Sequence, residues 1–348
     1  MRRRELLAQR LIILAISFTA GLVVIWLTSS SPVQAIHSFL TVPFSNRYFF
    51  GNLLTLMIPF IFTGLAASIS FQANEFNLGI EGQCYFSALV GTWLALQLGE
   101  VNRMLAIPLI IFVSAVTGGS FALISAFLKS KYAVNELISS LLIGYSLIHV
   151  TDFFLEGPML DLQAGLIATK TIDNGLMLSK ILPPSNFNSG FFWGIAFLII
   201  FYFILRKSVF GLKMTIYGQN SRFSEYMGIK GSKVVHKAFF LSGAVAGMGG
   251  IIDILGVHTK MIRGFSFGYG WTGIAVALIA SNQNTPNARN NPIWIIPAAF
   301  LFAFLESAAS TSAIFSDLTP EISKIIQASI FFLVTVSFWK KSGDHQTT

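Results

Sequence analysis

The chain has 348 residues, of which 54% are hydrophobic and only 11% are charged, with 34 phenylalanines among them. The mean hydropathy of +0.69 excludes an ordinary soluble domain and indicates an integral membrane protein. The net charge of +8 does not indicate nucleic-acid binding, because the basic residues concentrate in a few loops and do not form a stripe with stacking aromatics.

The first predicted span runs from Leu11 to about Thr28. Arginines crowd the ten residues before it and place the N-terminus in the cytoplasm by the positive-inside rule. The apolar run is long for the core of a signal peptide, and no small-residue cleavage site follows closely. We therefore expect a retained span, with residues 29–50 outside the membrane.

The second predicted span, Gly51 to Ser70, leads into an unusually polar stretch, Phe71 to Gln83, with the sequence FQANEFNLGIEGQ. Such groups lie at membrane depth only where protein or a water-filled cavity surrounds them, so the stretch is a candidate functional site. A short solvated loop is the alternative. The next apolar segment, Cys84 to Leu98, is shorter than the roughly 20 residues that cross a bilayer. It is either a span that begins within the polar stretch or a broken, partly re-entrant helix, in which the only cysteine, Cys84, packs as a small residue.

Seven further apolar segments follow. They are Met104–Leu128, Val134–Leu155, Phe191–Leu205, Ala238–Val257, the short Trp271–Ser281, Pro292–Ser310 and Glu321–Trp339. An acidic loop after Leu155 is expected outside, and a loop at about 206–237, with seven basic residues against one acid, is expected in the cytoplasm. The sequence thus predicts an all-α, polytopic integral membrane protein with about ten transmembrane helices, one domain over residues 1–348 and both termini in the cytoplasm.

An internal similarity links the two short segments. The sequence FNLGIEGQ from Phe76 resembles FSFGYGWT from Phe265, with Gly79 and Gly268 in register. In the predicted topology the two motifs lie near opposite faces of the membrane, which suits two inverted five-span halves with broken helices. Chance similarity in a sequence rich in phenylalanine and glycine is the alternative.

The cytosolic loop from Gly218 to Gly231 is an amphipathic stretch of helix length. Ser221 is expected to cap this helix, and Glu225 in its first turn favours the helix dipole. Four apolar side chains, Phe223, Tyr226, Met227 and Ile229, are expected to form one surface, and an exposed apolar surface on a short helix is typical of a docking site. Packing of that surface on the chain's own spans is the alternative.

Several blocks carry a resemblance to a known family. In family order they read FQANEFNLGIEGQ, KYAVNELISSLLIGY, GLKMTIYGQNSRFSEYMGIKGSKV with KAFFLSGAVAGMGG, and GYGWTGIAVALIA. The chain resembles the permease subunits of bacterial ABC importers of the ribose, galactose and nucleoside type, which are relatives of the branched-chain amino-acid permeases. The resemblance runs from about Phe50 to Trp339, and the long region before the first motif resembles the larger of two paralogous nucleoside-type permeases.

The resemblance implies partners. These are a separate ATP-binding cassette ATPase, a second and paralogous permease subunit, an extracytoplasmic substrate-binding protein and the lipid of a bacterial cytoplasmic membrane. The chain has no GxxxxGK[ST] loop for ATP phosphates, so it is not expected to be an enzyme, and no cofactor or metal is expected.

Two sets of site residues follow from this interpretation. The candidate substrate path comprises Asn77, Glu81, Gln83, Asn135, Ser139, Gly268 and Gly270. Ser146 and His149 share a helical face with Asn135 and Ser139. The candidate ATPase docking residues are Asn220, Arg222, Phe223, Glu225, Tyr226, Met227 and Gly228. The chain departs from the family at Ser221, Phe223 and Ser224, where a proline and two alanines are usual, and at the polar Asn74 and Glu75.

The expected solute is a nucleoside, with riboflavin or a simple sugar as alternatives. An ion-coupled secondary transporter is an alternative of another class, because four carboxylates lie in or at the ends of spans, where ionised groups often relay protons. They are Glu136, Asp152, Asp253 and Glu306. The docking loop argues against that alternative, since a carrier powered by an ion gradient needs no motor. An intramembrane enzyme has no support, because neither HExxH nor GxSxG occurs.

Overall fold

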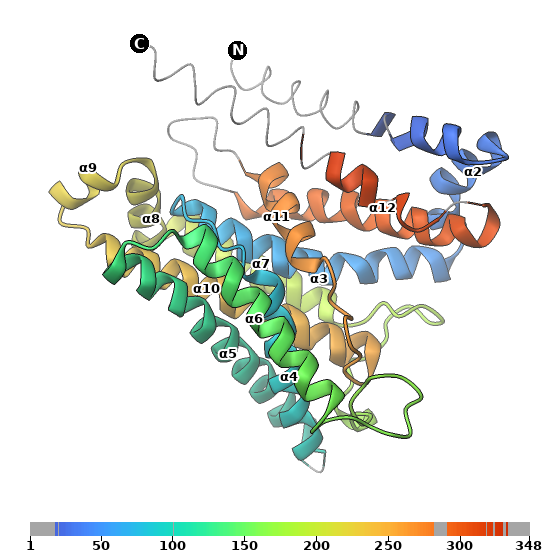
Figure 1. Cartoon of the computed structure of the whole chain (residues 1–348), viewed down its shortest axis with the longest axis horizontal. Coiled ribbons are helices and arrows are strands. Elements are labelled where there is room, and N and C mark those ends of the chain that lie inside the picture. Colours follow the sequence, from blue (N-terminus) through green and yellow to red (C-terminus); the bar gives the residue numbers. More distant parts are fainter. Residues whose placement is uncertain are drawn as a thin grey trace.

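The computed structural model describes residues 18–19, 21–99, 101–281, 291–317, 319–322, 324–329 and 332. Within these residues the regular structure is helical apart from two isolated β-bridges. The helices are α2 (Pro32–Thr41), α3 (Arg47–Gln72), α4 (Ile80–Gln97), α5 (Arg103–Tyr132), α6 (Glu136–Glu156), α7 (Gly190–Lys207), α8 (Val209–Gln219), α9 (Ser221–Tyr226), α10 (Gly231–Asp253), α11 (Tyr269–Ala280) and α12 (Ile295–Phe315), with short 3₁₀ turns at Val42–Phe44, Asn174–Leu176 and Pro292–Trp294 and a π-helical turn, Ile254–His258, that continues α10 (Figure 1).

Six of the described helical segments are long and apolar enough to cross a membrane. They are Arg47–Gln72, Arg103–Tyr132, Glu136–Glu156, Gly190–Lys207, Gly231–His258 and Pro292–Phe315. The chain is therefore a polytopic helical membrane protein, and these segments match six predicted spans. The count of about ten is not confirmed, because the first and last predicted spans lie partly outside the described residues, and α4 and α11 are shorter or less apolar than the six.

The two short helices each pack on the long helix of the other half of the chain. Helices α3 and α10 form the centre of the bundle. About nine-tenths of the residues in the most apolar stretch of each helix are buried. Helix α10 packs on α4 and α5, while α3 packs on α11 and α12. Helix α11 lies beside α3 in Figure 1. This reciprocal packing is consistent with two inverted halves, and the repeat itself stays a prediction. The prediction that the two motifs lie near opposite faces of the membrane is wrong, because Glu81 of the first motif is hydrogen-bonded to Gly268 of the second.

Small residues bring α5 and α10 into backbone contact. A Cβ atom added to Gly118 would meet the carbonyl oxygen of Gly243, and one added to Gly243 would meet the carbonyl oxygen of Gly118. Glycine at both positions allows the close helix crossing that membrane interiors favour, since lipid gives apolar faces little other reason to associate. Cys84 is buried in the same region, where its sulfur faces Gly250, as expected for a packing residue.

The segment before α2 is held in place by polar contacts. Helix α2 was not predicted from the sequence. The residues just before it are bonded to the chain just after α12, because Asp317 accepts hydrogen bonds from the hydroxyls of Ser29 and Ser30 and from the Ser30 amide, at 2.6 to 2.8 Å. These bonds lower the pKa of Asp317 to about 2. The loop between α6 and α7 lies at one end of the molecule, and α8 and α9 lie at the other (Figure 1).

Candidate transport path and docking element

The polar stretch forms the connection between α3 and α4. Helix α3 ends at Gln72, residues 73–79 form a turn in which Asn74 has a left-handed φ of 55°, and Gly79 is the N-cap of α4. Gly268, its counterpart in the internal similarity, is the N-cap of α11 and has a φ of 86°. Both glycines of the repeated motif therefore start a short helix.

Glu81 joins these two helix starts. Its carboxylate accepts hydrogen bonds from the backbone amides of Gly268, at 2.8 Å, and Gly270, at 2.6 Å. A Cβ atom on Gly270 would lie 2.6 Å from the Glu81 nitrogen, so only glycine allows this approach. The first amides of a helix lack internal partners and carry partial positive charge, which a carboxylate stabilises. We call this contact between α4 and α11 the Glu81 clamp, and it brings three predicted path residues together.

The length of α11 shows that this helix cannot cross a membrane alone. Its 12 residues span roughly 18 Å at 1.5 Å per residue, well short of a hydrocarbon core of roughly 30 Å. In transporters, broken helices whose amino termini meet near the bilayer midplane typically form solute sites. The clamp therefore stays a candidate for the solute path.

Asn77 and Gln83 pair with each other in this structure. The two side-chain amides exchange hydrogen bonds of 2.8 and 3.1 Å, and Asn77 also donates to the Ser242 hydroxyl on α10 at 3.0 Å. Asn77 is 0% exposed and Gln83 is 1% exposed. In this conformation the pair fixes the shape of the turn, and its assignment to the path stays a prediction that requires the pair to open.

Asn135 and Ser139 lie at the start of α6, next to the same turn. Asn135 caps α6 by accepting from the Leu137 amide at 2.9 Å, and Ser139 is buried. The neighbouring Ser140 hydroxyl, which the sequence analysis did not select, accepts from the Leu78 amide at 3.0 Å. Helix α6 therefore helps to hold the turn, and the role of Asn135 and Ser139 in the path stays a prediction.

A second polar cluster, missed from sequence, surrounds Glu75. The carboxylate lies 2.6 Å from the Lys129 amino group at the end of α5, and Lys129 also lies 3.1 Å from Glu136 at the start of α6. The Tyr217 hydroxyl on α8 donates to Glu75 at 3.3 Å. Burial raises the pKa of Glu75, and Lys129 opposes that rise. Burial, together with the Glu75 charge, raises the pKa of Tyr217 to about 12.

The predicted docking loop, Gly218 to Gly231, begins at the end of α8 and contains the short α9; we call α8 and α9 together the docking element. Asn220, not Ser221, is the N-cap of α9, because its side chain accepts from the Phe223 amide at 2.9 Å. The helix covers six residues, fewer than the sequence predicted, and Gly228 follows it with a left-handed φ of 73°.

The exposed apolar surface of α9 is confirmed in part. Phe223 is 52% exposed, Tyr226 91% and Met227 60%. Arg222, Glu225 and Gly228 are also exposed beside them. Ile229, which was expected to join this surface, is buried. We call Phe223, Tyr226 and Met227 the α9 surface.

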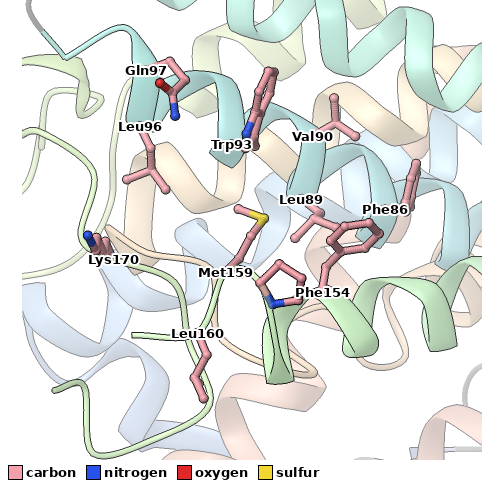
Figure 2. Close-up of a pocket in the computed structure, with 11 residues that line it drawn as sticks. Phe86, Leu89, Val90, Trp93, Leu96, Gln97, Phe154, Met159, Leu160 and Lys170 are labelled. Carbon is pink, nitrogen blue, oxygen red and sulfur yellow. The ribbon is translucent and has the colours of Figure 1, made fainter. Parts of the chain in front are cut away.

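Two cavities adjoin the short helices. The first, of about 280 Å³, lies beside the Glu81 clamp, and we call it the clamp cavity. Its lining includes Gly268 together with the aromatic Phe267 and Trp271 and the polar Thr272, Lys324 and Gln327. The second, of about 490 Å³, is the α4–α6 groove, where Figure 2 shows Trp93, Phe86, Phe154 and Met159 around a mostly apolar space, with Gln97 and Lys170 as its polar residues.

The four carboxylates that suggested proton coupling all have partners. Glu136 pairs with Lys129, as described above. Asp152 accepts from the Tyr85 hydroxyl at 2.9 Å and lies 3.4 Å from Arg263. Asp253 accepts from the Tyr269 hydroxyl at 3.1 Å, and Glu306 lies 3.1 Å from Lys324. Each carboxylate thus connects two elements of the fold.

These features define a class: a polytopic helical membrane protein in which the starts of two short helices meet and a short amphipathic helix lies at one end. The family model for the branched-chain amino acid transport system permease component matches residues 49–335, and the chain belongs to this family. It is a permease subunit of an ABC importer and not itself an enzyme, since the ATPase of such a system is a separate subunit.

Curated relatives cover nearly the whole chain. The chain is 28% identical to the glucose ABC transporter permease protein TsgB13 of Haloferax volcanii, over 89% of this chain and 82% of that protein. It is 26% identical to the nucleoside ABC transporter permease protein NupB of Lactococcus lactis, over 94% and 90% of the two chains. It is also 26% identical to the guanosine ABC transporter permease protein NupP of Bacillus subtilis, over 97% and 95%. No solved structure matches the chain significantly.

Proposed function

We propose that this permease carries a nucleoside, delivered by an extracytoplasmic binding protein, and that it works with a second, paralogous permease. The nucleoside and guanosine permeases named above align over more of this chain than the glucose permease does. Lactococcus lactis and Bacillus subtilis each also contain a second relative of the chain, the permeases NupC and NupQ, at 23% and 24% identity. Paired relatives within one organism support a heterodimer.

We propose that the solute path runs through the clamp cavity. The residues that line this cavity favour a nucleoside as the solute. Aromatic rings stack on a flat base, while hydroxyl, amide and ammonium groups hydrogen-bond to a ribose. Trp271 and Phe267 supply the rings, and Thr272, Lys324 and Gln327 supply the polar groups. A simple sugar has no flat base for the rings. Riboflavin has one, and the chain is 25% identical to the probable riboflavin import permease protein RfuC of Treponema pallidum, so riboflavin is the second candidate.

Replacing Trp271 by alanine is expected to raise the KM for nucleoside uptake about tenfold, because a stacked base contributes roughly 1–3 kcal/mol. The measurement is uptake of radiolabelled guanosine into vesicles that contain the complete transporter, with riboflavin and glucose as competitors. Trp93→Ala in the α4–α6 groove is the matched control and should leave the KM unchanged. A normal KM in Trp271→Ala, or a raised KM only in Trp93→Ala, would move the path away from the clamp cavity.

The α9 surface is proposed to dock on the ATPase, with α8, α9 and both chain termini in the cytoplasm. The excess of basic residues between 206 and 237 supports this orientation. Closure of two ATPase subunits around ATP would move the docking element, and the bundle would then open the path alternately to either side of the membrane. The residues of the Glu81 clamp would separate or rotate during this change.

A further inference from the structure

Helix α8 makes three contacts with the turn between α3 and α4. The Tyr217 hydroxyl donates to Glu75 at 3.3 Å, and the Gln72 side chain donates to the Thr215 hydroxyl at 2.6 Å. At Gly218, an added Cβ atom would lie 2.9 to 3.0 Å from the backbone of residues 72–74, so the two backbones touch. Only Asn220 separates α8 from α9. The docking element and the turn therefore form one packed unit.

The same turn is fastened to the rest of the bundle by buried polar bonds. Lys129 holds Glu75, which is 2% exposed. The Leu78 amide is held by Ser140 on α6, and Asn77 is held by Ser242 on α10. Buried polar bonds of this kind are costly to break, so the turn moves with its neighbours rather than independently of them.

The turn ends at the Glu81 clamp. Gly79 closes the turn and caps α4, and Glu81 follows in the first turn of that helix, where its carboxylate holds the amides of Gly268 and Gly270. A displacement of Glu75 is therefore transmitted over six residues of tightly bonded chain to the start of α11. Figure 1 shows α8 and α9 at the end of the bundle where α6 and α10 begin.

We infer that Tyr217 and Glu75 are positioning residues that couple the docking element to the Glu81 clamp, so that movement of α9 on the ATPase reaches the solute path through residues 73–79. This inference rests on the proposed function, because it presupposes that α9 docks on an ATPase and that the clamp borders the path. It assigns to the hydroxyl–carboxylate contact a part of the coupling that the Gln72–Thr215 bond and the backbone contact at Gly218 do not supply, and this contact can be removed without altering either end of the route.

The test is the Tyr217→Phe variant in the complete complex, reconstituted in vesicles with ATPase, partner permease and binding protein. Three quantities are measured: ATPase retained on purification, ATP hydrolysis, and guanosine taken up per ATP. We expect normal ATPase retention, with uptake per ATP falling severalfold, because the variant loses a hydrogen bond to a charged group that ties α8 to the turn. Glu75→Gln, which keeps the size of the side chain and removes its charge, should give the same pattern.

The control is Tyr132→Phe, the same chemical change on an exposed side chain at the end of α5. It should leave uptake per ATP at the wild-type value. Unchanged uptake per ATP in Tyr217→Phe would overturn the inference, and so would loss of the ATPase from that variant, since this would place Tyr217 in docking. Failure of the proposed function has a different signature, which is absence of ATP-driven uptake by the wild-type complex.

Discussion

Replacing Tyr226 and Met227 together by aspartate is expected to release the ATPase from the permease while the spans still insert. Both side chains are largely exposed, so the change removes little packing within the permease. Two charges would instead enter a surface that must lose water on docking, and burying an unpaired charge costs at least several kcal/mol. Apolar anchors at the centre of an interface carry most of its binding energy, so transport should fall to background.

The measurement is co-purification of the ATPase with tagged permease, together with the membrane content of the permease. Leu162→Asp is a suitable control, because Leu162 is at least as exposed as Met227 and lies in the loop at the opposite end of the molecule. This control should retain the ATPase. Normal ATPase binding by the double variant would show that the docking surface lies elsewhere on the permease.

Replacing Glu81 by leucine is expected to abolish uptake and to lower the thermal stability of the permease. The variant leaves the amides of Gly268 and Gly270 without their acceptor, and an unsatisfied buried donor costs about 1–3 kcal/mol. Glu81→Gln keeps one acceptor oxygen and the size of the side chain, so it should be intermediate in both respects. The start of α11 is the affected element in each variant.

Uptake and the melting temperature of the detergent-solubilised complex measure this effect. Glu321→Leu removes an exposed carboxylate in the chain after α12 and should change neither quantity by much. If Glu81→Leu melts and transports like the wild type, the clamp does not hold the two halves together.

Hydropathy alone located the six long spans, because each is a continuous apolar run whose length matches the bilayer. It also located α4 and α11 as short segments. Gly79 and Gly268, which the internal similarity aligns, are the N-caps of these two helices. Helix α2 was not predicted, because its ten residues are too few to be recognised as a membrane span and only three of them are buried.

The partners of the polar side chains were not predictable in the same way. The polar stretch itself stood out, but Glu81 bonds to backbone amides 187 and 189 residues away, and backbone amides have no sequence signature. Glu75 meets Lys129 and Tyr217 across 54 and 142 residues. Asn77 and Gln83 face each other only because the turn folds back over α4. These contacts depend on three-dimensional packing, which periodicity does not encode.

The most direct test of the account is guanosine uptake by vesicles that contain the two permeases, with the ATPase and binding protein added or withheld. The account predicts uptake that requires ATP on the side of the membrane where the ATPase is bound and the binding protein on the other side. This uptake should be unaffected when an imposed proton or sodium gradient is collapsed. Uptake that follows an ion gradient without ATPase or binding protein would contradict it.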